Sequence, residues 1–245
     1  MRVLIVGGSE EYVGAVYLAA LAAFRAGAES VIVMTPEKVA WALNALSPDL
    51  VTRKLPGKRL GLKHREAIMH QLKTADVLLI GNGTGTAHGT QTLMRALMRW
   101  QGLKVVDADA LKALKGNAVS HAILTPNAGE WKLLTEKNDV ETLVKKDIVI
   151  LKKGARPALI TSLGTKHIPR PDPGLTKAGT GDVLAGLCAG YLARGLDLAA
   201  ATERAAATSS HAARLLAQKR SHGFHYLASD LLGKIKRPRT TRKRG

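Results

Sequence analysis

The stretch KAGTGDVLAG, residues 177–186, sets two glycines directly before a single carboxylate. Gly179 and Gly181 permit backbone conformations in which N–H groups and the first turn of a following helix surround an anion. Asp182 in that turn can accept the proton of a substrate hydroxyl during phosphoryl transfer. In isolation the same residues are also typical of an acidic side chain that caps a helix. The chemical interpretation therefore depends on the other loops of the chain.

A second pair of polar residues occurs in TPNAGEWKLL, residues 125–134. Asn127 and Glu130 are three positions apart, which on the first turn of a helix brings an amide and a carboxylate to one face. Together they can hold magnesium through water near a nucleotide phosphate, because magnesium prefers oxygen ligands and keeps several waters. The alternative is a capping box, in which the two side chains only bind the first amides of the helix.

Three more loops carry candidate residues. In LKKGARPALI, Lys153 and Gly154 follow a strand, where the ammonium can meet a nucleotide phosphate or, alternatively, remain solvated. The alternating glycines of GNGTGT, residues 81–86, allow the backbone to approach a ligand closely, although a tight turn explains them equally well. In VVDADAL, Asp107 and Asp109 can reach the same site, and Asp109 is interpreted as a helix cap.

Several common site types are not predicted. Gly7 and Gly8 follow the first strand without the GxGxxG spacing of a dinucleotide-binding loop, and the chain contains no GxxxxGK[ST]. The histidines form no HExxH, and the single cysteine leaves no Cys/His spacing for zinc. Cys188 lies in an apolar run and is predicted to be an inert buried thiol.

Apolar strands alternate with helices along the chain, which predicts an α/β fold. Strands are expected at RVLIVGG, SVIVM, ADVLLIGNG, LKVVDAD and HAILTPN, and helices at VGAVYLAALAAFRAGA, TQTLMRALMRW, ALKAL and AGEWKLL. Strands without polar alternation belong in a mostly parallel central sheet with helices on both faces. IVILKK, PALITS and TKHIP predict a short antiparallel edge, and helices near 181–194, 197–218 and 226–234 complete the domain. Ligands of such sheets bind beyond the carboxyl ends of the strands, where the candidate loops begin.

Length and charge limit the remaining possibilities. A chain of 245 residues with 46% hydrophobic content fits one domain, predicted at 1–235. The net charge is +18, and residues 236–245 are expected to form a disordered basic tail. With 4% aromatic residues there are few platforms on which bases can stack, so nucleic-acid binding is expected only through the tail. The absence of a long apolar run and of a secretory leader predicts a cytoplasmic protein with no membrane contact.

In this order the loops resemble those of the ADP- or ATP-dependent NAD(P)H-hydrate dehydratases, a branch of the ribokinase-like superfamily. The resemblance extends from GGSEEYVGAVYLAALAAFRAGA to PGLTKAGTGDVLAG and leaves out only the basic tail. It implies a ribokinase-like fold and a repair reaction on hydrated NADH or NADPH, S epimer. A nucleotide phosphorylates the hydroxyl of the hydrated ring, and loss of phosphate restores the reduced cofactor. Mg²⁺ is the implied cofactor, and ADP or ATP is the implied phosphoryl donor.

The resemblance also implies roles for individual residues. Asp182 is the implied base at the ring hydroxyl. The implied nucleotide-binding residues are Lys153, Gly154, Ala155, Arg156, Pro157, Gly179, Thr180 and Gly181. The implied contacts of the hydrated dinucleotide are Ala15, Gly83, Gly85, Asn127, Glu130 and Asp182. The chain departs from the common family pattern at Asn82, Asn127-Ala128, Pro157 and Lys177, which leaves the choice between ADP and ATP open.

Two other interpretations and two partners follow from the same sequence. GTGD and Asn-x-x-Glu also occur in vitamin-precursor kinases of the superfamily, such as hydroxyethylthiazole and pyridoxal kinases. The basic composition alone would suit a nucleic-acid-binding protein. The family resemblance further implies a homo-oligomer, with a tetramer possible. A separate epimerase is expected as well, because 245 residues leave no room for the epimerase domain that many members carry.

Overall fold

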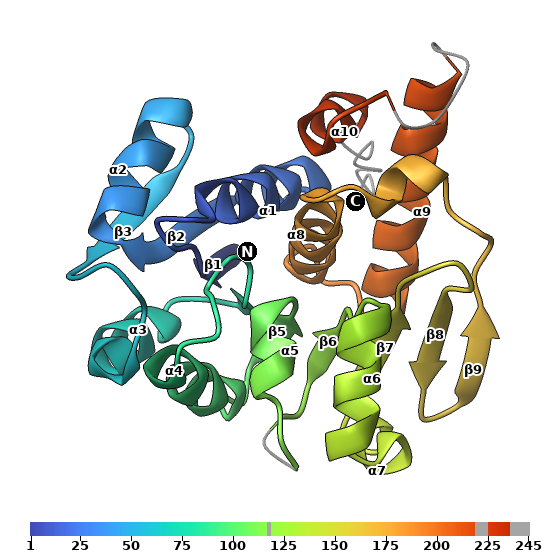
Figure 1. Cartoon of the computed structure of the whole chain (residues 1–245), viewed down its shortest axis with the longest axis horizontal. Helices are drawn as coiled ribbons and strands as arrows, with labels where there is room; N and C mark the ends of the chain where they lie inside the picture. The colour runs from blue at the N-terminus through green and yellow to red at the C-terminus, as the bar shows by residue number, and fades with distance from the viewer. Residues whose placement is uncertain (117–118, 219–224, 236–245) are drawn as a thin grey trace, which may run out of the picture.

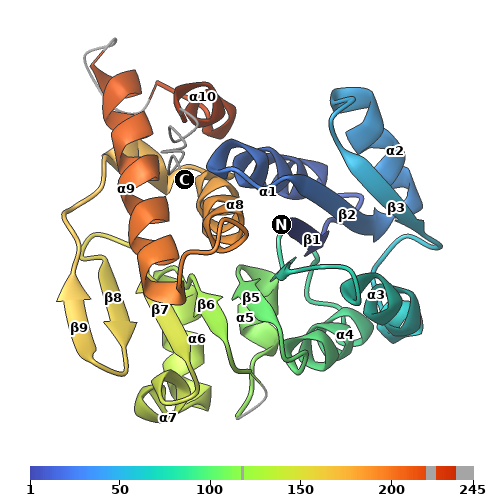
Figure 2. The ribbon, with the colours of Figure 1, turned by 180° about the vertical axis from the view of Figure 1, so that it is seen from behind.

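The computed structural model describes residues 1–116, 119–218 and 225–235 as one sheet covered by helices on both faces (Figure 1, Figure 2). The strand order is β3-β2-β1-β4-β5-β6-β7-β8-β9. Neighbours from β3 to β7 are parallel, whereas β8 pairs antiparallel with β7 and with β9. The strands are β1 (Arg2–Val6), β2 (Ser30–Pro36), β3 (Val51–Leu55), β4 (Val77–Ile80), β5 (Leu103–Val106), β6 (Ala122–Leu124), β7 (Ile148–Lys152), β8 (Ala158–Thr161) and β9 (Gly164–His167).

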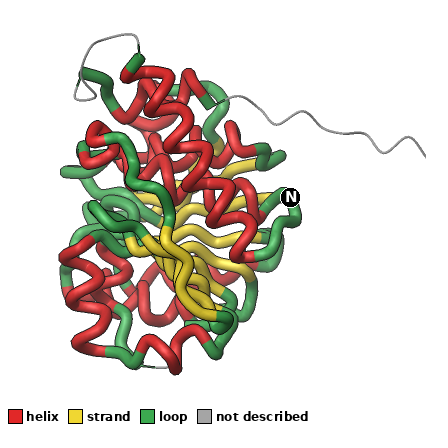
Figure 3. The backbone as a smooth tube through the Cα atoms, turned by 90° about the vertical axis from the view of Figure 1, so that its right-hand side faces the viewer, coloured by secondary structure: helices red, strands yellow, loops and turns green. Residues whose placement is uncertain are grey.

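The helices form one layer on each face of the sheet, and Figure 3 shows the strands enclosed between the two layers. One layer holds α1 (Val13–Ala26), α2 (Glu37–Leu46), α8 (Thr180–Leu192), α9 (Leu198–Ala217) and α10 (Ala228–Lys234). The other holds α3 (Arg65–Leu72), α4 (His88–Met98), α5 (Asp109–Ala113), α6 (Ala128–Lys137) and α7 (Val140–Val144). Two short 3₁₀ helices, η1 (Leu62–His64) and η2 (Pro173–Thr176), lie in the connections.

Two apolar cores explain why the strands lack polar alternation. In β1, Val3 and Ile5 pack into the core beneath α1 and α8, while Leu4 and Val6 pack into the opposite core beneath α3 and α4. A strand buried on both faces needs apolar residues at every position. The architecture expected from the sequence, a mostly parallel central sheet with helices on both faces and a short antiparallel edge, is confirmed.

The close packing of α8 on α1 places the start of α8 beside the sheet (Figure 1). A Cβ atom at Gly186 would lie 2.1 Å from the carbonyl oxygen of Ala19, and one at Gly190 would lie 2.4 Å from that of Ala23. Only glycine allows the helix backbones to approach this closely. Small residues along α1 and α8 therefore determine the position of the first turn of α8 relative to the sheet.

The segment between β2 and β4 was not predicted from the sequence. It contains α2, β3, η1 and α3, and β3 is an edge strand in which four of the five residues are exposed or half-buried. Such a strand has no continuous apolar run to reveal it. Elsewhere the expected strands and helices are present, and Cys188 is fully buried, which raises the pKa of its thiol to about 12 and agrees with an inert role.

The sequence also led to expectations about a basic tail and about membrane contact. Residues 236–245, the predicted basic tail, lie outside the described residues. Within the described ranges, no helix has the length and apolar character needed to cross a bilayer.

Candidate active site

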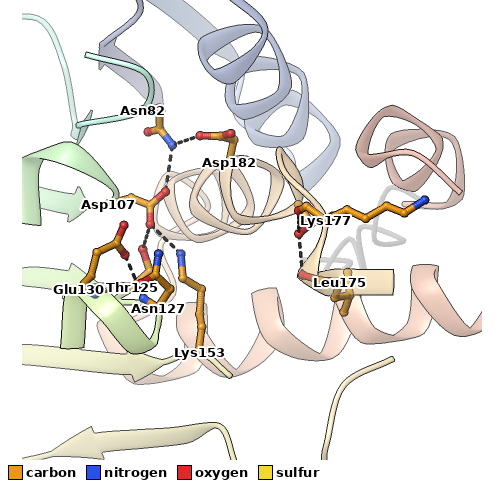
Figure 4. Close-up of polar contacts among 10 residues, drawn as sticks. Asn82, Asp107, Thr125, Asn127, Glu130, Lys153, Leu175, Lys177 and Asp182 are labelled. Atoms are coloured by element: carbon orange, nitrogen blue, oxygen red, sulfur yellow. Dashed lines mark hydrogen bonds and ion pairs between the residues drawn. The ribbon is translucent and has the colours of Figure 1, made fainter. Parts of the chain in front are cut away.

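Polar side chains that follow β4, β6 and β7 converge on one carboxylate, which follows β5 (Figure 4). Asp107, which follows β5, accepts hydrogen bonds at Oδ1 from Lys153 Nζ at 2.9 Å and from Thr125 Oγ1 at 2.6 Å. Its Oδ2 accepts a bond from Asn82 Nδ2 at 3.0 Å. The donors follow β7, β6 and β4, respectively. The carboxyl edge of the sheet thus collects one polar residue from each of β4, β5, β6 and β7, and open α/β sheets bind ligands at this edge.

Asp182 joins this cluster from the start of α8. Its Oδ1 accepts a hydrogen bond from Asn82 Nδ2 at 2.7 Å. The residue before the helix, Gly179, has a left-handed φ of 86°, and no side chain caps α8. The carboxylate of Asp182 is therefore bound to the strand cluster. The alternative interpretation of GTGD required it to cap its own helix, and it makes no such bond.

A cavity of about 550 Å³ opens beside the cluster, and a site of this size suits a small-molecule ligand. Most of the predicted site residues line it: Asn127, Glu130, Lys153, Gly154, Ala155, Pro157, Gly179, Thr180, Gly181 and Asp182. Arg156 is absent from that lining, although both of its neighbours in the chain contribute to it. Leu151, Ile168, Leu175 and Leu184 give part of the cavity an apolar wall.

The remaining predicted contacts, Ala15, Gly83 and Gly85, form an adjoining region that does not line this cavity. Gly83 packs against the start of α1, where a Cβ atom would lie 3.0 Å from Cβ of Ala15. The N–H of Gly85 donates to Asp109 Oδ2 at 2.9 Å. Asp109 also binds Lys112 at 2.7 Å and makes no capping bond to α5, so its interpretation as a helix cap is wrong. Asn82 in the same loop connects this region to Asp182.

Asn127 and Glu130 form a capping box, which was the alternative to a magnesium site in the sequence analysis. The N–H of Glu130 donates to Asn127 Oδ1, and the N–H of Asn127 donates to Glu130 Oε2, both at 2.9 Å. Burial raises the pKa of Glu130, while the bond from Asn127 and the nearby Lys153 act in the opposite direction. The cap uses one oxygen of a carboxylate that also lines the cavity.

The same two residues fit a magnesium ion only through water. No group of three or more Asp, Glu, His or Cys side chains that could hold a metal directly is present in the part of the chain that the structure describes. Mg²⁺ commonly keeps several waters and is bound by one or two carboxylates together with substrate phosphates. One carboxylate and one amide at the edge of the cavity meet that requirement.

Burial sets the charge state of the cluster. It raises the pKa of Asp182 to about 6, with a further contribution from Asp107 and a smaller opposing one from Asn82 and Lys153. Burial alone would lower the pKa of Lys153, but the carboxylates of Asp107 and Glu130 outweigh it and the pKa is raised. Lys153 therefore remains an ammonium, and Asp182 changes its charge close to neutral pH.

Thr125 and Asn82 were missed as members of the cluster, and Asp107 was given only a minor role. Each is the first or second residue after a short buried strand, so the strand ends themselves were the available signal. Lys177, one of the departures from the family pattern, extends away from the cluster (Figure 4). Its Nζ donates to the carbonyl oxygen of Tyr226 at 2.9 Å.

Comparison with known proteins identifies the family. A sequence model described as NAD(P)H-hydrate dehydratase matches residues 3–237. The chain belongs to this family. The resemblance seen in the sequence is thereby confirmed, and the match covers the sheet from Val3 onward together with every residue of the cluster.

Two curated relatives and one solved structure show the extent of the similarity. A bifunctional NAD(P)H-hydrate repair enzyme of Pyrobaculum aerophilum is 37% identical over 99% of this chain and 50% of its own length. An ADP-dependent (S)-NAD(P)H-hydrate dehydratase of Streptococcus thermophilus is 33% identical over 79% of this chain and 73% of its own. The chain thus spans about half the length of the first relative. The ADP/ATP-dependent dehydratase of Bacillus subtilis, crystallised with ATP/Mg²⁺, shares the fold with a TM-score of 0.78 at 23% identity, covering 96% of this chain and 87% of that one.

Replacing Asp182 by Asn is expected to stabilise the folded protein at neutral pH. The pKa of Asp182 is about 6 in the folded protein against an ordinary 3.8, so stability falls as the pH rises between these values. Above that window the buried carboxylate costs about 1–3 kcal/mol, which a neutral amide avoids. Urea unfolding should show Asp182→Asn to be more stable at about pH 7.5 and equal to the parent below about pH 3.8.

The exposed Asp49→Asn is the control and should change stability at neither pH. A loss of stability for Asp182→Asn at pH 7.5, or a gain of equal size at both pH values, would contradict the assignment of a strained carboxylate at this position.

Removing the ammonium of Lys153 is expected to be strongly destabilising. Asp107 is 2% exposed, and Lys153→Met leaves its buried carboxylate with only neutral donors. The expected loss in the free energy of unfolding is about 3–5 kcal/mol. Lys152→Met is the matched control, because the neighbouring ammonium lies 5.3 Å from the centroid of the Trp131 ring and should contribute less than about 1 kcal/mol. Equal losses of unfolding free energy in the two variants would show that the ion pair between Lys153 and Asp107 does not stabilise the fold more than Lys152 does.

Proposed function

We propose that this protein carries out the nucleotide-dependent dehydration of hydrated NADH or NADPH, S epimer. The observation that carries the proposal is the position of Asp182. Its partly buried carboxylate lines the cavity at the first turn of α8, with its pKa raised to about 6 and an ammonium in the same cluster. A general base of this kind operates best when its pKa lies near the working pH. The family assignment and the activities of the named relatives support the same reaction.

The nucleotide is proposed to bind with its terminal phosphate at the start of α8. A helix leaves its first N–H groups without partners inside the helix, and its dipole favours an anion there. A Cβ atom at Gly181 would lie 3.3 Å from Lys153 Nζ, so the ammonium lies against the backbone of that first turn. Lys153 and these amides would stabilise the charge on the transferred phosphoryl group.

The wider nucleotide site is proposed from the cavity lining. Gly154, Ala155, Pro157, Gly179 and Thr180 contribute to it, whereas the proposed role of Arg156 lacks this support. Use of ADP is known for the relative in Streptococcus thermophilus, and the Bacillus subtilis dehydratase was crystallised with ATP/Mg²⁺. Either nucleotide is accordingly proposed as the donor.

The proposed chemistry begins with the ring hydroxyl. Asp182 accepts its proton as the oxygen attacks the terminal phosphoryl group, so that a new P–O bond forms while the bond to the rest of the nucleotide breaks. Breaking of the ring C–O bond then releases phosphate with its bonding electrons. Loss of a ring proton completes the double bond of the reduced nicotinamide. The net result is hydrolysis of the nucleotide coupled to loss of water from the hydrate.

The hydrated dinucleotide is proposed to lie on the other side of Asp182, along Ala15, Gly83 and Gly85 and toward Asn127 and Glu130 at the start of α6. Asn127 and Glu130 would hold Mg²⁺ through water, and the ion, when bound, supplies charge neutralisation at the nucleotide phosphates. A homo-oligomeric assembly and an epimerase on a separate chain remain predictions.

The test is incubation of the purified protein with hydrated NADH or NADPH, Mg²⁺ and ADP or ATP while the absorbance of the reduced ring is followed. Nucleotide-dependent recovery with release of phosphate is expected. Asp182→Asn should lower the rate by about 10²–10⁴-fold, the usual contribution of a general base, while nucleotide binding is kept. Formation of a stable phosphate ester from a vitamin precursor, without dehydration, would instead favour the kinase interpretation.

The rate should also depend on pH through Asp182. Since the carboxylate must be ionised to accept a proton, kcat/KM is expected to fall on the acidic side with a midpoint at about 6. Measurements of kcat/KM from about pH 4.5 to 8.5 give this midpoint directly. A rate that stays constant down to pH 4.5 would contradict a base with a raised pKa.

A further inference from the structure

The side-chain amide of Asn82 lies between two carboxylates. Its Nδ2 is 2.7 Å from Oδ1 of Asp182 and 3.0 Å from Oδ2 of Asp107, and the residue is fully buried (Figure 4). An amide NH₂ group carries two protons and can donate one to each carboxylate. Asn82 is thus the link between the catalytic candidate on α8 and the cluster at the ends of the strands.

The orientation of this amide is determined by its neighbours. The opposite orientation would set the amide oxygen against the oxygens of Asp107 and Asp182, which have no proton to donate when both groups are ionised. In the orientation found, Oδ1 is buried without a hydrogen-bond partner among the described residues. A buried acceptor without a partner is costly. The site therefore keeps an asparagine here for its two donors, despite the unsatisfied oxygen.

The backbone around Asn82 is fixed on both sides. Gly81 has a φ of 112°, and a Cβ atom there would lie 1.9 Å from the carbonyl oxygen of Asp107. The carbonyl oxygen of Asn82 accepts a hydrogen bond from the N–H of Gly8 at 2.8 Å. The loop after β4 is therefore held between the ends of β1 and β5, and the amide has little freedom to leave the carboxylates.

We propose that Asn82 is a positioning residue that aims the Asp182 carboxylate at the substrate and keeps it ionised beside Asp107. The charged groups that act on Asp182 are Asp107, Asp109 and Lys153. Burial and the two carboxylates favour the protonated form, while the Asn82 bond and Lys153 favour the ionised form. Asn82 thereby lets two acidic side chains occupy one buried site with Asp182 still able to act as a base near neutral pH. Its catalytic consequence rests on the proposed function.

The experiment measures the ionisation of Asp182 without relying on activity. The full chain is labelled with ¹³C at the side-chain carboxyl of aspartate, and its NMR titration is compared with that of Asn82→Leu and Asn82→Asp. Both substitutions keep the approximate size of the side chain; leucine removes the donors outright, and aspartate removes them when it is ionised. The Asp182 resonance is identified by its absence from Asp182→Asn. Thr84→Val is the control, because Thr84 is buried in the same loop and, among the described residues, its hydroxyl bonds only to the carbonyl oxygens of Gly81 and Gly85.

The midpoint of Asp182 is expected to rise by about one pH unit in Asn82→Leu and further in Asn82→Asp, which adds a third carboxylate. Thr84→Val should leave it unchanged. If Asn82→Leu does not fold, Asn82→Asp carries the same measurement. Midpoints that stay within a few tenths of a pH unit of the parent, or failure of both variants to fold, would overturn the proposal in favour of a purely structural role.

The fall of kcat/KM on the acidic side of its pH profile, its acidic limb, tests this inference and the proposed function separately. If Asp182 is the base, the limb moves upward with the NMR midpoint, and the loss of rate at pH 6 is partly recovered at pH 8. If the NMR midpoint moves while the pH profile of the rate does not, Asn82 still positions Asp182, but Asp182 is not the base.

Discussion

The buried carboxylate of Asp107, with one ammonium and a second carboxylate beside it, is the constraint on which the site depends. Asp107 is almost fully buried and can remain so only because Lys153, Thr125 and Asn82 all donate to it. A buried charge is tolerated when it is paired and hydrogen-bonded. Removing one partner is destabilising because it leaves the other charge buried without compensation. Asp182 differs in that its oxygen has one donor from the cluster and its side chain also lines the cavity. One carboxylate thus organises the site while the other faces the ligand.

The rest of the fold brings these groups together. Parallel strands end at the same edge of the sheet, so residues after β4, β5, β6 and β7 meet although they are far apart in sequence. The backbone between Asp107 and Asp109 includes Ala108, whose φ of 49° is unusual for a residue with a side chain. On either side of this residue, Asp107 binds Lys153 and Asp109 binds the N–H of Gly85, and such local strain is typical of functional sites. The glycine contacts between α8 and α1 then set the first turn of α8 over the cluster.

The fold class followed from the sequence because both of its causes are local. Apolar runs such as VLLI and AIL predict strands buried on both faces, and the alternating helices require parallel connections between them. Asp182, Lys153 and the Asn127–Glu130 pair were likewise recognisable from residue type and nearby glycines. The edge strand β3 escaped prediction because its exposed residues carry no apolar pattern.

The partners of these residues were decided by the tertiary structure. Nothing local to GNGTGT distinguishes Asn82 as a donor to two carboxylates 25 and 100 positions away. The pKa of Asp182 likewise depends on burial between a helix and a sheet edge, and burial is a property of the folded chain alone. The sequence by itself determined most of the elements and the side chains capable of the chemistry, since propensity and periodicity act over a few residues. The tertiary structure decided which of those side chains are hydrogen-bonded, ion-paired or line one cavity. It did so by packing α8 on α1 and by placing the strand ends side by side.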